Sequence, residues 1–199
     1  MQAMERQRLP GQRAGLTRGD LLKTARELLA EGGLDALTMR ALAARLGVAP
    51  NALYSHVASK IALIDDVLDD VLAEVEAPAG DEQDAGAALH ALMASTYDVL
   101  LAHPELVPIF MTRQGARGPN AQRLGDIMLA LLARGDTTGS RALEARRVLI
   151  IYTIGFAAFT TRPPLEPADG SPLPSDEIVK NFDSGLRWLL AAIGRPTGR

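Results

Sequence analysis

The sequence contains no cysteine. This absence excludes disulfide bonds, zinc sites built from thiolates and cysteine nucleophiles. The first residues, MQAMERQRLPGQR, lack the apolar stretch of a secretory signal. The longest apolar run, from Val148 to Phe159, has 12 residues, whereas a helix needs roughly 20 apolar residues to cross a bilayer. We therefore expect a cytoplasmic protein with no membrane partner.

The net charge of −3 is unevenly distributed along the chain. Residues 1–60 contain nine Lys and Arg against five Asp and Glu, a net charge of +4. Residues 61–199 contain twelve against nineteen, a net charge of −7. A basic first third followed by an acidic remainder favours a polyanionic partner for the N-terminal end.

The spacing of the apolar residues predicts helices throughout, and no segment shows the alternation of a strand. Thr17 and Asp20 form a variant of the capping box at the start of the first helix, which Gly32-Gly33 is expected to end. Thr38 is a suitable N-cap for a second, short helix. A third helix is expected to begin at Pro50, with Leu53 and Val57 on its inward side, and a fourth near Ser59. Beyond the fourth, we expect helices at about 84–102, 104–113, 119–134, 140–161 and 176–193. The pattern predicts an all-α fold of about nine helices.

Two segments interrupt the helical pattern. Residues 77–84, APAGDEQD, mark a boundary between two domains, which we place at 16–76 and 77–199. Residues 162–175, RPPLEPADGSPLPS, are too rich in proline to be helical throughout and are expected to form a loop.

The most informative stretch runs from Leu37 to Lys60, LTMRALAARLGVAPNALYSHVASK. Two short helices joined by a turn at Gly47 would form a helix-turn-helix, in which the second helix can enter the DNA major groove. The apolar side chains required inside are those of Leu42, Leu46, Val48, Leu53 and Val57. The polar and aromatic side chains left to face a duplex are those of Arg40, Arg45, Asn51, Tyr54, Ser55, His56 and Lys60.

Together with the helix before it and the start of the helix after it, this stretch resembles the DNA-binding domain of the TetR (tetracycline repressor) family, from about Leu16 to Val71. The runs GGLDALTMRALAARLGV and LYSHVASKIALID carry the resemblance. It implies an N-terminal three-helix DNA-binding domain and a C-terminal helical domain that binds an effector and dimerises.

The resemblance also implies roles for individual residues. Thr38 would cap the second helix and bind a phosphate, Arg40 would read a guanine, and Lys60 would bind a phosphate. The tip of the recognition helix would consist of Pro50, Asn51 and Ala52, and the run that contacts backbone and bases would consist of Tyr54, Ser55 and His56. Ala49 departs from the family pattern, because a Ser or Thr cap is common at that position.

The C-terminal domain is expected to hold a small-molecule pocket between its helices, because the family architecture has one there. The candidate ligand-binding residues are Met93, Tyr97, Phe110, Met111, Arg113, Met128, Tyr152 and Phe156, with Thr153 as a further polar contact. The helix at about 140–161 is apolar on almost every side, so we expect it to pack against more than its own subunit. With the helix at about 176–193, it would form half of an intersubunit four-helix bundle in a homodimer.

No catalytic or metal-binding constellation stands out in the sequence. Asp65, Asp66, Asp69 and Asp70 contain i, i+4 pairs, but no histidine accompanies them at ligand spacing, so we interpret them as a solvated acidic face. We expect no metal, no cofactor and no enzymatic activity. The sequence favours a homodimeric repressor that a small, largely apolar effector releases from a palindromic operator of double-stranded DNA. The alternatives are a helical carrier or enzyme with an incidental helix-turn-helix, and an interaction module that does not contact DNA.

Overall fold

The structure is a computed structural model that describes residues 16–78, 84–161 and 174–194. Within these ranges it contains nine α-helices, one short 3₁₀ helix and no strand, which confirms the all-α prediction. Most of the expected loop at 162–175 lies outside the described residues. The elements are α1 (Arg18–Ala36), α2 (Met39–Leu46), α3 (Pro50–Leu53), α4 (Lys60–Val71), η1 (Leu72–Glu74), α5 (Ala85–Ala102), α6 (Val107–Arg113), α7 (Pro119–Arg134), α8 (Gly139–Thr161) and α9 (Ser175–Ile193).

Local signals set the boundaries of the first helices. Thr17 and Asp20 form the expected capping box: the Thr17 hydroxyl accepts a hydrogen bond from the Asp20 N–H, and the Asp20 carboxylate accepts one from the Thr17 N–H. The Thr38 hydroxyl likewise caps α2 by accepting from the Ala41 N–H at 3.0 Å. Gly47 ends α2 in the left-handed conformation, with φ of 66°, which glycine adopts without steric cost.

The first regular helix ends at Gly32-Gly33, as the sequence predicted. Both glycines depart from helical geometry, Gly33 with φ of 63° and ψ of −155°, and a second, short helical segment follows them to Ala36. The range of α1 therefore covers two helices that meet at a kink. The bend brings Leu37 into the core, where it is fully buried.

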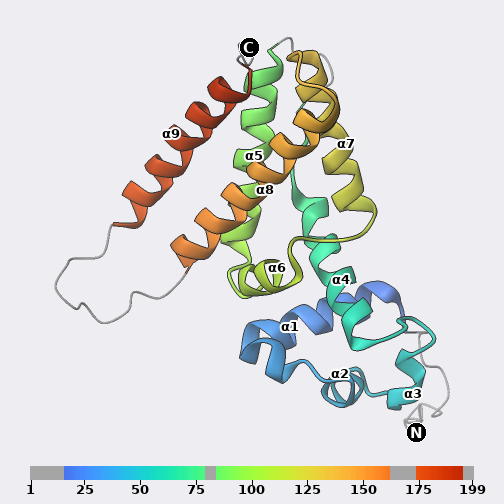
Figure 1. Cartoon of the computed structure of the whole chain (residues 1–199). Coiled ribbons are helices and arrows are strands. Elements are labelled where there is room, and N and C mark those ends of the chain that lie inside the picture. Colours follow the sequence, from blue (N-terminus) through green and yellow to red (C-terminus); the bar gives the residue numbers. More distant parts are fainter. Residues whose placement is uncertain (1–15, 79–83, 162–173, 195–199) are drawn as a thin grey trace, which may run out of the picture.

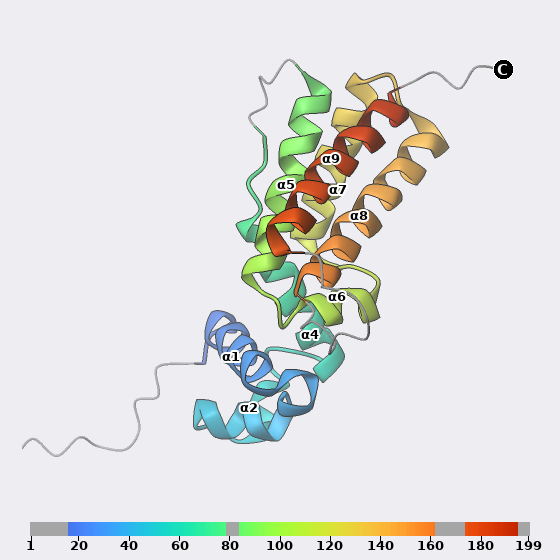
Figure 2. The ribbon, with the colours of Figure 1, turned by 90° about the vertical axis from the view of Figure 1, so that its left-hand side faces the viewer.

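The helices are arranged in two parts that α4 connects (Figure 1). At the lower end of the view, α1 packs against α2 and α4, and α2 packs against α3. In the upper part, α5 packs against α7, α8 and α9. Figure 2 shows α9 lying along α5 and α8, on the outside of the bundle. The unit formed by α1, α2 and α3 thus lies at one end of the molecule, away from the bundle of α5, α7, α8 and α9.

By length and composition alone, α5 could span a membrane. It is the one helix within the described ranges that meets these two criteria. Its Leu89, Leu92, Met93 and Leu100 are nevertheless buried among the neighbouring helices of the bundle. The apolar character of α5 is therefore that of a core helix.

The four aspartates of α4 do not form the solvated acidic face that we expected. Each of them contacts a group from another part of the fold. Asp69 is buried, and it accepts hydrogen bonds from the backbone N–H groups of Asn120 (3.2 Å) and Ala121 (2.8 Å) at the start of α7. The other three pair with arginines: Asp65 with Arg113, Asp66 with Arg18, and Asp70 with Arg26. The carboxylates instead join α4 to α1, α6 and α7.

Candidate DNA-binding surface and effector cavity

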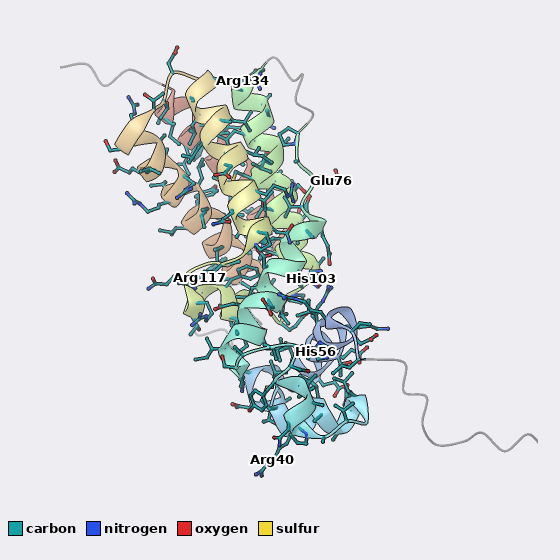
Figure 3. The ribbon with its side chains drawn as sticks, turned by 90° about the vertical axis from the view of Figure 1, so that its right-hand side faces the viewer. Arg40, His56, Glu76, His103, Arg117 and Arg134 are labelled. Carbon is teal, nitrogen blue, oxygen red and sulfur yellow. The ribbon has the colours of Figure 1, made fainter. Side chains whose placement is uncertain are left out.

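The first part of the predicted DNA-binding surface is the N-terminal end of α2. The Thr38 side chain is exposed beside this helix start, where its hydroxyl caps the backbone and free N–H groups favour an anion such as a phosphate. Arg40 is exposed in the first turn of α2 and makes no hydrogen bond or ion pair with the described residues. Figure 3 shows it extending from the end of the molecule, away from the bundle.

The second part is α3 and the turn that follows it. Helix α3 spans only Pro50–Leu53, so Tyr54, Ser55 and His56 lie in a tight turn after the recognition helix and not within it. Leu53 and Val57 anchor the segment in the core. The outward side chains are exposed, and Tyr54 retains 53% of its surface; this exposed set comprises Pro50, Asn51, Ala52, Tyr54 and Ser55. As the sequence indicated, Ala49 provides no side-chain cap for α3.

Three of the predicted residues are already partly engaged within the protein. Arg45 pairs with Glu31 of α1, with an Nη2–Oε2 distance of 2.7 Å, and this hydrogen bonding lowers the pKa of the Glu31 carboxyl. The Lys60 amine donates a hydrogen bond to the Leu34 carbonyl at 3.0 Å and is half-buried. His56 is also half-buried. Arg40 and Tyr54 are therefore more available to a partner than Arg45 and Lys60.

A cavity of about 430 Å³ lies between α5, α6, α7 and α8. Most of its wall is apolar, with Leu92, Leu100, Leu124 and Ile150 among the lining residues. Its size falls in the range of small-molecule sites, which is roughly 300–1,000 Å³. Three of the eight predicted ligand-binding residues line it: Met93, Phe110 and Met128.

The structure places the other five predicted residues outside this cavity. Tyr97 is directed toward the opposite side of α5, where its ring stacks on Phe182 at 3.9 Å and burial raises the pKa of its phenol. Tyr152 and Phe156 lie on the α9 side of α8, beside a separate hollow. Met111 is half-exposed, and Arg113 forms an ion pair with Asp65 on α4 (2.6 Å). Helical spacing located these side chains on apolar helices, but it did not show which neighbour each helix face would meet.

The residues that sequence reasoning missed are the charged ones of the cavity wall. These residues are Arg117, Arg146 and Arg147. Thr153, which the sequence indicated as a polar contact, also lines the cavity, and its side chain is fully buried. Arg146, Ile150 and Thr153 are spaced i, i+4 and i+7 on α8, which places them on one face. That spacing was a usable signal in the sequence, although only the fold shows that this face meets a cavity.

The described residues thus combine a helix-turn-helix at one end of the chain with a largely apolar cavity in the helical bundle. This is the arrangement of a helix-turn-helix transcriptional regulator. Residues 21–67 match the family model described as "Bacterial regulatory proteins, tetR family". A curated relative from Saccharopolyspora erythraea, named as an HTH-type transcriptional regulator, is 30% identical over 92% of this chain and 86% of its own length. This chain belongs to the TetR family.

Further relatives agree with this assignment. The tetracycline repressor protein class A of Escherichia coli is 34% identical over 68% of this chain and 62% of its own length. Among solved structures, apo ActR from Streptomyces coelicolor superposes with a TM-score of 0.76 at 25% identity, covering 92% of this chain and 96% of ActR. ActR has also been solved in complex with (S)-DNPA, and that structure superposes with a TM-score of 0.74 at 26% identity, covering 90% of this chain and 98% of ActR.

Proposed function

We propose that this protein is a cytoplasmic, homodimeric transcriptional repressor without enzymatic activity. Residues 16–76 bind a palindromic operator, and residues 77–199 bind a small, largely apolar effector that releases the DNA. The observation that carries this proposal is the position of Arg40 and Tyr54, which are exposed on a helix-turn-helix at the end of the molecule opposite the bundle. The tetracycline repressor among the relatives and the ligand complex of ActR support it.

The DNA-contact proposal is tested by comparing two arginines of the same helix. Arg40 has no partner among the described residues, whereas Arg45 is paired with Glu31. A bidentate arginine–guanine contact contributes about 1–3 kcal/mol of discrimination. We therefore expect Arg40→Ala to weaken operator binding by roughly tenfold or more and Arg45→Ala to weaken it less.

The measurement is a titration of operator DNA, located by footprinting, against each variant at several salt concentrations. The wild-type protein should retain its site in the presence of competitor DNA and show a steep loss of affinity with salt, because phosphate contacts release counterions. A carrier or an interaction module would show neither behaviour. Equal losses of operator affinity in Arg40→Ala and Arg45→Ala would contradict the assignment of Arg40 as a base contact.

The dimer proposal rests on apolar side chains that α8 and α9 leave exposed. Trp188 retains 75% of its surface, Ile151 70% and Phe159 61%. Large apolar side chains gathered on adjacent helices indicate a protein interface, and a twofold dimer would present two recognition helices about 34–36 Å apart. We expect Trp188→Glu to shift the protein toward monomer in sedimentation velocity and to weaken operator binding. Val179→Glu is the control, because Val179 is exposed on α9 but lies nine residues before Trp188, on the opposite flank of the helix.

The proposed signal passes from the cavity to α4. Residues 114–118 line the cavity and lie between Arg113, which pairs with Asp65, and Asn120, which bonds to Asp69. An effector that displaces this segment changes the support of α4 and so the placement of the helix-turn-helix. The effector must bind the two arrangements unequally for this to work. An operator affinity that is the same with and without a bound effector would rule the scheme out.

A further inference from the structure

The charged side chains that line the cavity are all of one sign. They are Arg117, Arg146 and Arg147, and no Asp or Glu is among the described residues that line it. Several arginines elsewhere in the described ranges are matched by carboxylates, as Arg45 is by Glu31 and Arg113 is by Asp65. The cavity is therefore a cationic site with an apolar wall.

Arg146 is the central charge of this site. It lies on α8 and is half-buried, and it has no hydrogen bond or ion pair with any residue that the structure describes. Its guanidinium reaches across to α7, where Nη1 lies 3.3 Å from the position that a Cβ on Gly125 would occupy. A cation that is partly withdrawn from water favours a counter-ion, because its hydration is only partly replaced by the protein.

Thr153 supplies the second polar group, two helical turns along the same face of α8. Its side chain is fully buried and its Oγ1 has no hydrogen-bond partner. Other helical threonines in the bundle bond to the carbonyl four residues earlier, as Thr96 does to Leu92 and Thr160 does to Phe156. A buried hydroxyl without a partner is unfavourable. Because Thr153 lines the cavity, a molecule bound there can supply the missing partner.

We propose that the effector is an organic anion with an extended apolar body. Its anionic group, a carboxylate or a group of similar geometry, pairs with Arg146, and a second polar atom bonds to Thr153 Oγ1. Seven residues of helix separate the two contacts by about 10 Å along the axis, and Ile150 lies between them against the apolar body. Arg117 and Arg147 add attraction for an anion. This inference rests on the proposed effector function of the cavity.

Two pairs of matched compounds test the charge requirement: 1-naphthaleneacetate with 1-naphthaleneacetamide, and decanoate with decanamide. Binding to the full chain is measured by isothermal titration calorimetry. We expect at least one acid to bind at least tenfold more tightly than its neutral amide. Arg146→Gln should abolish that preference, whereas Arg123→Gln, an exposed arginine of α7 outside the cavity wall, should preserve it.

Thr153→Val tests the second polar contact, and one of its two readouts, the melting temperature, needs no ligand. Removing a buried hydroxyl that lacks a partner should leave the melting temperature of the ligand-free protein unchanged or higher, and it should weaken binding of the preferred acid. The proposal is overturned if neither acid binds, if acid and amide bind equally, or if Arg146→Gln retains the preference. Operator binding by the ligand-free protein is measured separately, so a failure of the anion proposal is distinguishable from a failure of the repressor function.

Discussion

Replacing Asp69 with alanine should destabilise the protein far more than replacing its neighbour Asp66. Asp69 is only 6% exposed and belongs to α4, but its carboxylate caps α7. Helix α7 has no cap of its own, because Gly118 at the N-cap position has no side chain. The Asp69 carboxylate supplies the missing acceptor for two backbone N–H groups and also accepts from the Asn120 side-chain amide at 3.2 Å.

The magnitude follows from the contacts that Asp69→Ala removes. Loss of an N-cap costs about 1 kcal/mol, and leaving buried donors unsatisfied adds about 1–3 kcal/mol. We therefore expect a loss of about 3 kcal/mol in the free energy of unfolding. For a chain of this length, that loss corresponds to a fall of about 6–12 °C in melting temperature.

Asp66→Ala is the matched control on the same helix. Asp66 pairs with Arg18 at 2.6 Å, but the Arg18 side chain is 61% exposed, and pairs at the surface contribute about 0–1 kcal/mol. Denaturant and thermal unfolding at one protein concentration would measure both variants. If Asp69→Ala costs no more than Asp66→Ala, then the carboxylate of Asp69 does not cap α7. Asn120→Ala, which removes one of the donors, should give an intermediate loss.

Three further predictions concern α9 and pH. A Cβ on Gly185 would overlap the Tyr152 Oη, so Gly185→Ala should cost about 1–3 kcal/mol of stability by overpacking. Chemical denaturation should show partial recovery when Tyr152→Phe is added. Burial raises the pKa of Tyr152 from 10.0 to about 12. The folded state therefore holds the Tyr152 proton more tightly than the unfolded state does. The resulting stabilisation is present below pH 10 and is lost as the pH rises toward 12. Tyr152→Phe should flatten the pH dependence of the unfolding free energy over that window, and an unchanged profile would contradict the role of Tyr152. For Glu74, burial favours a higher pKa, but the hydrogen bond and charge of His103 and the nearby Arg26 outweigh burial and lower it below 4.5. The contribution of ionised Glu74 to stability is present above pH 4.5 and is lost in more acidic solution. Glu74→Gln should therefore reduce the acid sensitivity of unfolding. Equal acid sensitivity in the wild type and the variant would refute this role of Glu74.

The helix-turn-helix could be predicted closely from sequence because its determinants are local. The caps at Thr17 and Thr38 and the left-handed turn at Gly47 depend on residues within a few positions of one another. The inward positions of Leu42 and Leu53 follow from helical spacing over a short stretch, and both side chains are fully buried. Even here, the turn after α3 was predicted as helix, because spacing alone does not show where a short helix ends.

The cavity and the acidic residues of α4 depended on contacts between distant segments. Tyr97 and Met93 are both buried residues of α5, yet Tyr97 meets α9 and Met93 meets the cavity. Asp69 occurs in an acidic stretch that reads as a solvated face, but it is buried because the start of α7 packs against it.

Sequence by itself determined the all-helical class, the DNA-binding segment and the family, because periodicity, capping and the family pattern are written along the chain. Tertiary structure alone decided which side chains surround the cavity and which charges remain unmatched there. The physical reason is that a helix presents several faces, and only packing determines which face meets a neighbouring helix, solvent or a cavity.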